Sequence, residues 1–432
     1  MKGKKILVLT SCLIVSLATF SQEKLQLSLA DAKAYALAYN RTLQTSDLAV
    51  QKAEAAKWQA IASMLPHVDA ALGYNNFMGY EMKFNIQGMG EISSPVDPTG
   101  TLNAKATMAF SGMQFVGVQL SKLAIEMSNL NKNIGALDVK VNVTTAYFTA
   151  LVAEESKRLM ENSQENLQRL YETTNKMYEV GMSEQIAVDQ LDVQVGLVQN
   201  EVKKAERNIE LAYNALRLVL GSNDAQLELV ETLDGFLINN DAYSTAVSEF
   251  DINQNYNVQL INQNIELSKK QLNLKRWEYA PTLALFYQYT DVKYFGEEPM
   301  MKSVVPNTIG ASLNIPIFSS GERLSKVRQA KFDVKTAELT KQDAVEGLRV
   351  QEKQLRFLLN SAIETYELQK KNVTVSERIF KNTVQKYELG VMSSTELTTI
   401  NNNLISAQGS YIGALMDLLT AQVNLQKLLN QL

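Results

Sequence analysis

Apolar residues recur every seven positions along two stretches of the chain, and the two stretches are copies of one pattern. The first contains Val188, Val195, Val202, Ile209 and Leu216, interleaved with Leu191, Val198, Ala205, Ala212 and Val219. The second contains Leu397, Leu404, Tyr411, Leu418 and Leu425, interleaved with Ile400, Ala407, Ala414, Ala421 and Leu428. Such heptad spacing predicts a helix packed along a straight seam in each half. Because the copies lie 209 residues apart in a 432-residue chain, we expect two copies of one large unit.

A short stretch with a shared residue pattern precedes each seam. The stretches run from Tyr178 to Ser183 and from Tyr387 to Ser394. Within them, Gly181 and Gly390 can each end a helix in a left-handed conformation, and a serine after the second glycine can cap the next helix. We therefore predict two helical hairpin tips, at about 178–183 and 387–394.

A long helical pattern leads into each tip, from about Gly117 in the first half and Glu322 in the second. At 1.5 Å per residue, roughly 60 residues give a rod of about 90 Å. A shorter helix, at about 42–64 or 252–279, and the return helix after the tip together match that length. Each half is therefore predicted to be a long helix antiparallel to two shorter helices stacked end to end.

Between the shorter and the long helix of each half, the apolar period changes to two. The expected strands occupy about 67–77, 101–111, 282–290 and 307–316. Each has one apolar face and one small or polar face. Strands of this kind fit tilted membrane-spanning strands, and Tyr74, Tyr287 and Tyr289 suit an aromatic girdle. The alternative is an ordinary half-buried sheet in a secreted helical protein.

A membrane sheet must close, because lipid cannot satisfy open strand edges. Small barrels need about eight strands, so the four predicted strands of one chain are too few. A curved single layer of helices has two unpaired sides as well. We therefore expect several copies of the chain to share one barrel.

The first 21 residues have the features of a secretory signal peptide. Lys2, Lys4 and Lys5 precede an apolar run from Ile6 to Leu17 that is too short for the alternative, a membrane anchor. The only cysteine, Cys12, lies inside this run, too near the start for a lipoprotein, so we expect no disulfide in the mature chain. No other stretch has about 18 consecutive apolar residues, so no transmembrane helix is expected.

Charge and motif content favour neither nucleic-acid binding nor catalysis. Removal of three signal-peptide lysines leaves 39 basic and 46 acidic residues, a net charge of −7 that disfavours nucleic acid as a partner. The single histidine, His67, is expected at a turn on the surface. The chain has no G-x-S-x-G motif, phosphate-binding loop or His/Cys metal spacing, so we expect no enzyme activity, cofactor or metal.

Three motifs resemble those of the outer-membrane efflux protein family, the TolC-like channels of Gram-negative bacteria. They are the turn from Pro316 to Gly321 after the fourth strand, the Tyr-Glu-x-Gly tips, and Ser394 to Leu397 after the second tip. The resemblance covers nearly all of the mature chain, as a first repeat (22–220), a junction (221–251) and a second repeat (252–432). Gln114 to Gly117 is a degenerate first-half copy of the turn, because it lacks the proline.

The resemblance implies an exit duct for a tripartite efflux or type I secretion system. It implies a homotrimer with a shared 12-stranded β-barrel in the outer membrane and a 12-helix tunnel in the periplasm. A periplasmic adaptor (a membrane fusion protein) would dock on the tips, and an inner-membrane transporter would supply energy. A periplasmic coiled-coil spacer is the alternative function, and the residues do not identify the exported substrate.

Two sets of residues match functional positions of that family. Adaptor docking is implied for Val180, Gly181, Met182, Leu389, Gly390 and Val391. Glu396 matches an acidic gate ring, which attracts cations when three copies surround a pore. The family's second acidic position is Thr399 here, which implies a weaker or absent second ring. As alternatives, the glycines are simple helix stops and Glu396 is an acid that favours a helix N-terminus.

Overall fold

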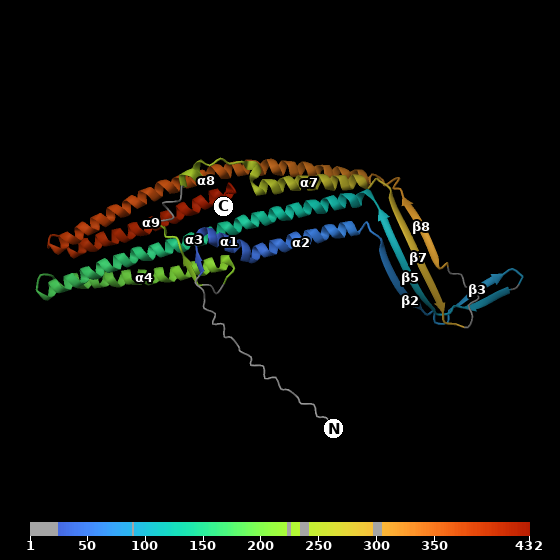
Figure 1. Cartoon of the computed structure of the whole chain (residues 1–432), viewed down its shortest axis with the longest axis horizontal. Helices are drawn as coiled ribbons and strands as arrows, with labels where there is room; N and C mark the ends of the chain where they lie inside the picture. The colour runs from blue at the N-terminus through green and yellow to red at the C-terminus, as the bar shows by residue number, and fades with distance from the viewer. Residues whose placement is uncertain (1–24, 89, 223–225, 234–241, 297–304) are drawn as a thin grey trace, which may run out of the picture. The chain divides into compact units, whose positions relative to one another are not determined.

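The computed structural model describes residues 25–88, 90–222, 226–233, 242–296 and 305–432, and the protein is mostly helical (Figure 1). The helices are α1 (Leu29–Tyr39), α2 (Arg41–Ala62), α3 (Gly112–Glu179), α4 (Gln185–Leu220), α6 (Ala242–Val247), α7 (Tyr256–Trp277), α8 (Glu322–Glu388) and α9 (Ser394–Leu428). The strands are β1 (Leu25–Leu27), β2 (His67–Asn75), β3 (Glu81–Ile86), β4 (Gly90–Pro95), β5 (Thr99–Phe110), β6 (Leu227–Leu229), β7 (Thr282–Tyr294) and β8 (Asn307–Asn314). The predicted signal peptide, residues 1–21, lies outside the described residues.

The chain forms two compact units, and the long helices α3 and α8 contribute to both. The first unit comprises Met1–Asn40, Val139–Ser244 and Ser361–Val423. The second comprises Arg41–Asp138, Thr245–Asn360 and Asn424–Leu432. The first unit contains the hairpin tips, and the second contains the larger sheet.

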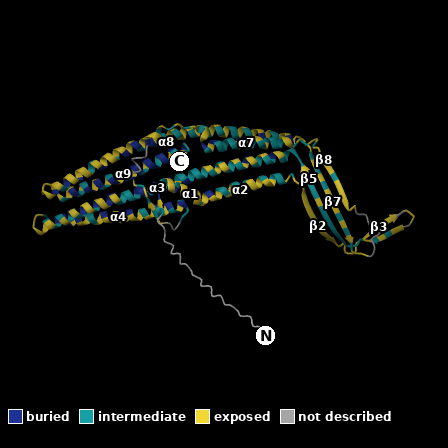
Figure 2. Ribbon diagram, in the orientation of Figure 1, coloured by how far each residue is buried: buried dark blue, intermediate teal, exposed yellow. Residues whose placement is uncertain are grey.

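The core of the first unit follows the two heptad seams. Leu191 on α4 and Leu397 on α9 are fully buried, and Figure 2 marks buried residues recurring along both helices. They belong to one apolar cluster that also contains Leu167, Leu170, Val198, Phe380, Tyr387 and Leu404. The return helices therefore bury the residues that the seven-residue pattern selects.

A short parallel pair of strands, β1 and β6, closes the N-terminal part of the first unit. Leu25 lies opposite Leu227, and the buried Tyr147 hydroxyl of α3 donates a hydrogen bond to the Leu27 carbonyl at 3.1 Å. A capping box formed by Ser28 and Asp31 begins α1. This sheet was not predicted, because three-residue strands are too short to show alternation.

The larger sheet lies in the second unit and has the antiparallel order β2-β5-β7-β8. Its register brings the apolar positions of all strands to one face: Val68, Leu72, Tyr74, Leu102, Ala104, Ala106, Met108, Leu283, Leu285, Tyr287, Tyr289, Ile309, Ala311 and Leu313. The opposite face carries mainly polar residues, among them Asp69, Lys105, Gln288 and Thr308. Among the described strands, β2 and β8 form the open edges of this sheet.

Helices of the second unit pack antiparallel beside one another. Lys132 of α3 pairs with Asp47 of α2 at 2.5 Å, and the Gln114 amide of α3 donates to the Ser63 carbonyl just after α2. Glu278, the residue just after α7, pairs with Lys326 of α8. The pKa of Glu278 is lowered by its hydrogen bond to Lys275 and by Lys326.

One prediction about the strands was wrong. No strand was predicted between about residues 77 and 101, because that stretch is rich in glycine, proline and serine. The structure instead has the β3–β4 hairpin there, and β5 begins at Thr99. Gly88 and Gly90 have positive φ angles, so these glycines build the turn of a hairpin.

Candidate functional site

The first hairpin tip ends α3 in a Schellman motif. Gly181 has a φ of 75°, and its N–H donates to the Tyr178 carbonyl at 2.9 Å. The Met182 N–H donates to the Met177 carbonyl at 2.7 Å. These two bonds satisfy carbonyls at the helix end, so the predicted helix stop at Gly181 is confirmed.

The second tip has the same geometry. Gly390 has a φ of 73° and donates to the Tyr387 carbonyl at 2.9 Å, and Val391 donates to the Lys386 carbonyl at the same distance. The Ser393 hydroxyl then accepts a hydrogen bond from the Glu396 N–H at 3.2 Å and caps α9. In the first tip the N-cap of α4 is Glu184, which makes no side-chain cap bond, so serine capping is confined to the second tip.

The apolar side chains at both tips face solvent. Val180 and Met182 are 70% and 78% exposed, and Leu389 and Val391 are 77% and 74% exposed. A Cβ added to either tip glycine would meet no atom within 4 Å. Both tips are therefore open surfaces with two apolar side chains beside a backbone that only glycine adopts easily.

Glu396 lies in the first turn of α9 and is exposed. Within the described part of the chain, no cationic side chain pairs with its carboxylate. Thr399, one turn further on, donates its hydroxyl to the Thr395 carbonyl at 2.9 Å. The position suits either function of Glu396 that the sequence left open.

Three polar contacts join the two hairpins of the first unit. The buried Thr174 hydroxyl of α3 bonds the Tyr387 hydroxyl of α8 at 3.2 Å. Ser394 at the start of α9 donates to the Gln190 amide oxygen of α4 at 2.9 Å. Further along, Ser163 of α3 donates to Gln408 of α9 at 3.2 Å. The hairpins are thus fixed to one another by hydrogen bonds as well as by the apolar cluster.

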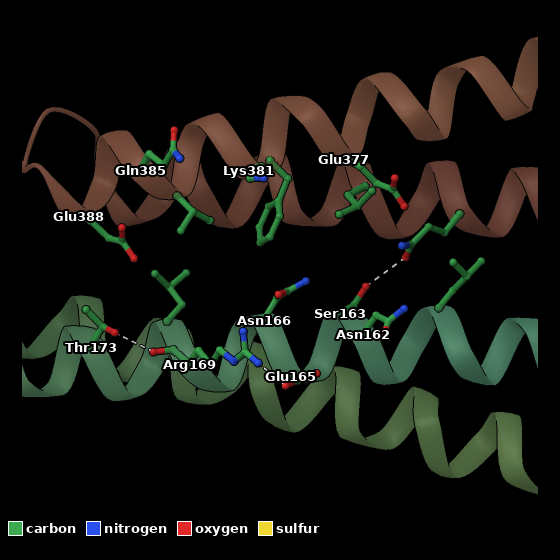
Figure 3. A pocket seen from close by; sticks show the side chains of 16 residues that line it. Asn162, Ser163, Glu165, Asn166, Arg169, Thr173, Glu377, Lys381, Gln385 and Glu388 are labelled. Carbon is green, nitrogen blue, oxygen red and sulfur yellow. Dashed lines mark hydrogen bonds and ion pairs between the residues drawn. The ribbon is translucent and has the colours of Figure 1, made fainter.

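A pocket of about 650 Å³ lies between these hairpins, with side chains from α3 and α8 pointing toward one another (Figure 3). Its polar lining includes Asn162, Glu165, Asn166, Arg169, Glu377, Lys381, Gln385 and Glu388. Arg169 forms an ion pair with Glu165 of its own helix. Leu159, Leu170, Phe380, Val384 and Leu404 complete most of the lining. Because ligand pockets usually have only a few polar groups, a lining with this many charged and amide side chains does not indicate a ligand site.

Two helices carry apolar stripes outside their buried seams. On α8, the stripe consists of Phe332, Leu339, Val350, Phe357, Leu368 and Ile379, all exposed. On α4, it consists of Ile186, Val193, Leu197, Leu211 and Leu218, also exposed. Successive residues are 7 or 11 apart on α8 and 4, 7 or 14 apart on α4, so each set lies on one side of its helix at 3.6 residues per turn. These two stripes were not predicted, although apolar residues outside the heptad seams were the sequence signal for them.

The described residues contain no group of three or more His, Cys, Asp or Glu side chains that could hold a metal ion. His67 begins β2 and is exposed, as expected for a surface histidine. Within the same described ranges, every helix is too short or too polar to cross a membrane.

Heptad-packed helical hairpins and an antiparallel sheet with one apolar face define a mostly helical protein whose sheet is compatible with a membrane. The Outer membrane efflux protein family matches residues 34–222 and 252–431. The chain therefore belongs to that family, which places it at the outer membrane of a Gram-negative bacterium.

Named relatives and solved structures agree with this assignment. The alkaline protease secretion protein AprF of Pseudomonas aeruginosa is 21% identical over 67% of this chain and 60% of its own length. The outer membrane protein TolC of Vibrio cholerae is 23% identical over 64% of this chain and 66% of its own length. The chain thus spans less than two thirds of these two relatives. The TolC of Salmonella enteritidis is 21% identical over 87% of this chain and 76% of its own length.

The fold is also shared with crystal structures of channels. A structure of CusC has a TM-score of 0.73 and 14% identity, and the match covers 93% of this chain and 91% of that chain. The Campylobacter jejuni CmeC outer membrane channel has a TM-score of 0.71 and 18% identity, covering 93% of this chain and 85% of that chain.

Proposed function

We propose that three copies of this chain form a passive exit duct across the outer membrane and the periplasm, serving a tripartite efflux or type I secretion system. The observation on which this rests is the sheet of the second unit, whose apolar face is exposed. Leu72 and Ile309 on that face are 84% and 85% exposed. Exposure of such an apolar surface to water is unfavourable, whereas its contact with lipid is favourable.

The shared barrel follows from the edges of that sheet. Its strands have 9, 12, 13 and 8 residues, close to the roughly 9–11 residues of a tilted membrane strand. Pairing β8 of one copy with β2 of the next would satisfy both open edges and close a 12-stranded barrel, with the polar face toward the lumen. Tyr287 and Tyr289 would then lie in an aromatic girdle.

The helices supply a second reason for association. The exposed stripes on α8 and α4 would be covered if the α8 side of one copy lay against the α4 side of the next. Phe357 and Leu218 are 71% and 73% exposed in the single chain. Covering such residues favours oligomerisation by roughly 1.5–3 kcal/mol for each fully buried side chain. The two repeats, 22–220 and 252–432, would each supply half of a subunit's wall, and the two-segment family match supports this division.

The two tips are proposed as the docking surface for a periplasmic adaptor that links the duct to an inner-membrane transporter. Their support is the exposure of Val180, Met182, Leu389 and Val391 around glycines with positive φ angles. Each tip presents two exposed apolar side chains on a turn of fixed conformation, which suits contact with apolar residues of a partner's helical hairpin. Glu396, exposed just past the second tip, is proposed as the acidic ring at the periplasmic end.

The relatives are named for different cargoes. AprF is named for secretion of an alkaline protease, and a Pseudomonas putida relative is named as part of a toluene efflux pump. In such a system, selection of the cargo would lie mainly with the inner-membrane transporter.

Membrane residence distinguishes the duct from a periplasmic coiled-coil spacer. Isolated outer membranes should keep the protein through a wash in concentrated urea and release it only in detergent. The detergent extract should contain trimers by light scattering. Release of the protein by urea alone would contradict the duct and support the spacer.

A further inference from the structure

The β3–β4 hairpin has one face that is satisfied within the hairpin. The Ser93 hydroxyl of β4 donates to the Glu81 carboxylate of β3 at 2.6 Å. On the same face, Lys83 pairs with Glu91 at 2.9 Å. Lys83 and Glu91 neutralise each other and Glu81 is hydrogen-bonded, so this polar face is suited to water.

The other face of the hairpin is apolar and uncovered. Tyr80, Met82 and Phe84 alternate along it, and Phe84 lies directly opposite Ile92. Tyr80 is 61% exposed, Met82 44% and Phe84 47%. An isolated two-stranded hairpin is marginally stable in water, so these large side chains need a covering surface.

The hairpin lies at the end of the sheet that is remote from the helices. It joins the end of β2 to the start of β5, while the opposite ends of those strands connect to α2 and α3 (Figure 1). Met78 and Gly79, with φ angles of 51° and 78°, turn the chain sharply out of β2. In the proposed duct this end is the outer mouth of the barrel.

We propose that the apolar face of this hairpin is covered by the same hairpin of neighbouring copies, so that three hairpins converge over the outer mouth. The proposal rests on the trimeric duct. The hairpin emerges from β2, an edge strand of the sheet, which places it beside the next copy. In the proposed arrangement the three apolar faces would meet at the threefold axis, and the three polar faces would lie outside.

Charge argues against the outer-leaflet lipid as the covering surface. Between residues 80 and 97, Glu81, Glu91 and Asp97 outnumber the single Lys83, giving a net charge of −2. A leaflet rich in lipid-linked phosphates would repel such a segment, whereas a second copy would meet its apolar face with an identical one. The converged hairpins would narrow the mouth with a cluster of aromatic side chains.

Cysteine cross-linking in intact outer membranes tests the arrangement. Phe84→Cys or Met82→Cys, each in a Cys12→Ser background, should give covalent dimers on mild oxidation. The matched control is Asn85→Cys, an exposed neighbour on the polar face. The apolar-face variants should give at least about tenfold more dimer than the control.

Two further readouts separate the possible results. Light scattering of the detergent extract reports trimers independently of the cross-link. If trimers form but Phe84→Cys and Met82→Cys cross-link no more than Asn85→Cys, the hairpin proposal is overturned and the duct is not. If the unsubstituted protein forms no trimers, both proposals are overturned. A fluorophore on Phe84→Cys that is quenched by brominated lipid would show a membrane-covered face and would also overturn it.

Discussion

Thr174 on α3 and Tyr387 on α8 bond through their hydroxyl groups at 3.2 Å, although both side chains are almost completely buried. Tyr387 is also a member of the apolar cluster between the hairpins and supplies the carbonyl that accepts from Gly390. One residue therefore takes part in the helix end at the second tip, the apolar core and the contact to the other hairpin.

Tyr387→Phe should destabilise the first unit because it leaves the buried Thr174 hydroxyl without this partner. The expected loss is about 1–2 kcal/mol. Thr174→Val in the same background should recover much of it, since both polar partners are then replaced by apolar groups. The helical circular dichroism signal during denaturant unfolding measures each step, and simple addition of the two single losses would contradict direct coupling.

Substitution of both tip glycines should abolish adaptor docking while trimers still form. Gly181→Val with Gly390→Val places β-branched residues at φ angles of 75° and 73°, where each costs about 1–2 kcal/mol or distorts the turn. The matched control is Gly196→Val with Gly409→Val, because these glycines are exposed and lie within α4 and α9. The measurement is the amount of adaptor cross-linked to the protein in cells. If the tip variant cross-links as much adaptor as the control variant, the tips are not the docking surface.

The sequence predicted the elements whose signal lies in their own residues. Heptad spacing identified Leu191, Leu397 and Leu404 as buried, and Gly390 was recognised as a helix stop because few other residues tolerate its conformation. Alternation identified the main strands, although β7 extends to Tyr294, beyond the expected end at about residue 290.

Features that depend on a distant partner were not predictable. The β1–β6 pair forms because Leu25 and Leu227 meet in space, across a large separation in sequence. The apolar stripes on α4 and α8 follow lines outside the heptad seams, so a search for seams passes over them. The burial of Asn401 was not predictable either, because nothing in the sequence of α9 indicates that this amide lies buried without a hydrogen-bond partner.

Glu396→Gln should change single-channel behaviour in planar bilayers. If three copies of Glu396 surround the periplasmic end, removal of their charge weakens cation attraction and should relieve block by divalent cations. Glu210→Gln on α4 removes an equal charge from an exposed position and serves as the control. Unchanged traces, together with a stability loss of about 0.3–1 kcal/mol, would instead identify Glu396 as an acid that stabilises the start of α9.

Alkaline pH should weaken the first unit through Tyr213. The pKa of Tyr213 is raised by burial and by its hydrogen bond to Glu154, at 2.5 Å. A raised folded-state pKa means that the stabilisation is complete below the ordinary tyrosine pKa of about 10 and is lost as pH rises above it. Tyr213→Phe should flatten the fall in melting temperature between pH 9 and 11, and an unchanged slope would exclude this residue as its cause.

Replacement of Asn401 by leucine should stabilise the protein. Asn401 is 1% exposed on α9, and both polar atoms of its side chain are buried without a hydrogen-bond partner among the described residues. A buried amide left unpaired costs about 1–3 kcal/mol, and leucine has a similar volume. Asn401→Leu should therefore raise the denaturant midpoint, whereas Asn402→Leu, at the exposed neighbouring position, should leave it nearly unchanged. A lower midpoint for Asn401→Leu would mean that the amide has a hydrogen-bond partner in the assembled duct, either water or a neighbouring copy. The same measurement on detergent-solubilised trimers and on dissociated chains would distinguish these two partners.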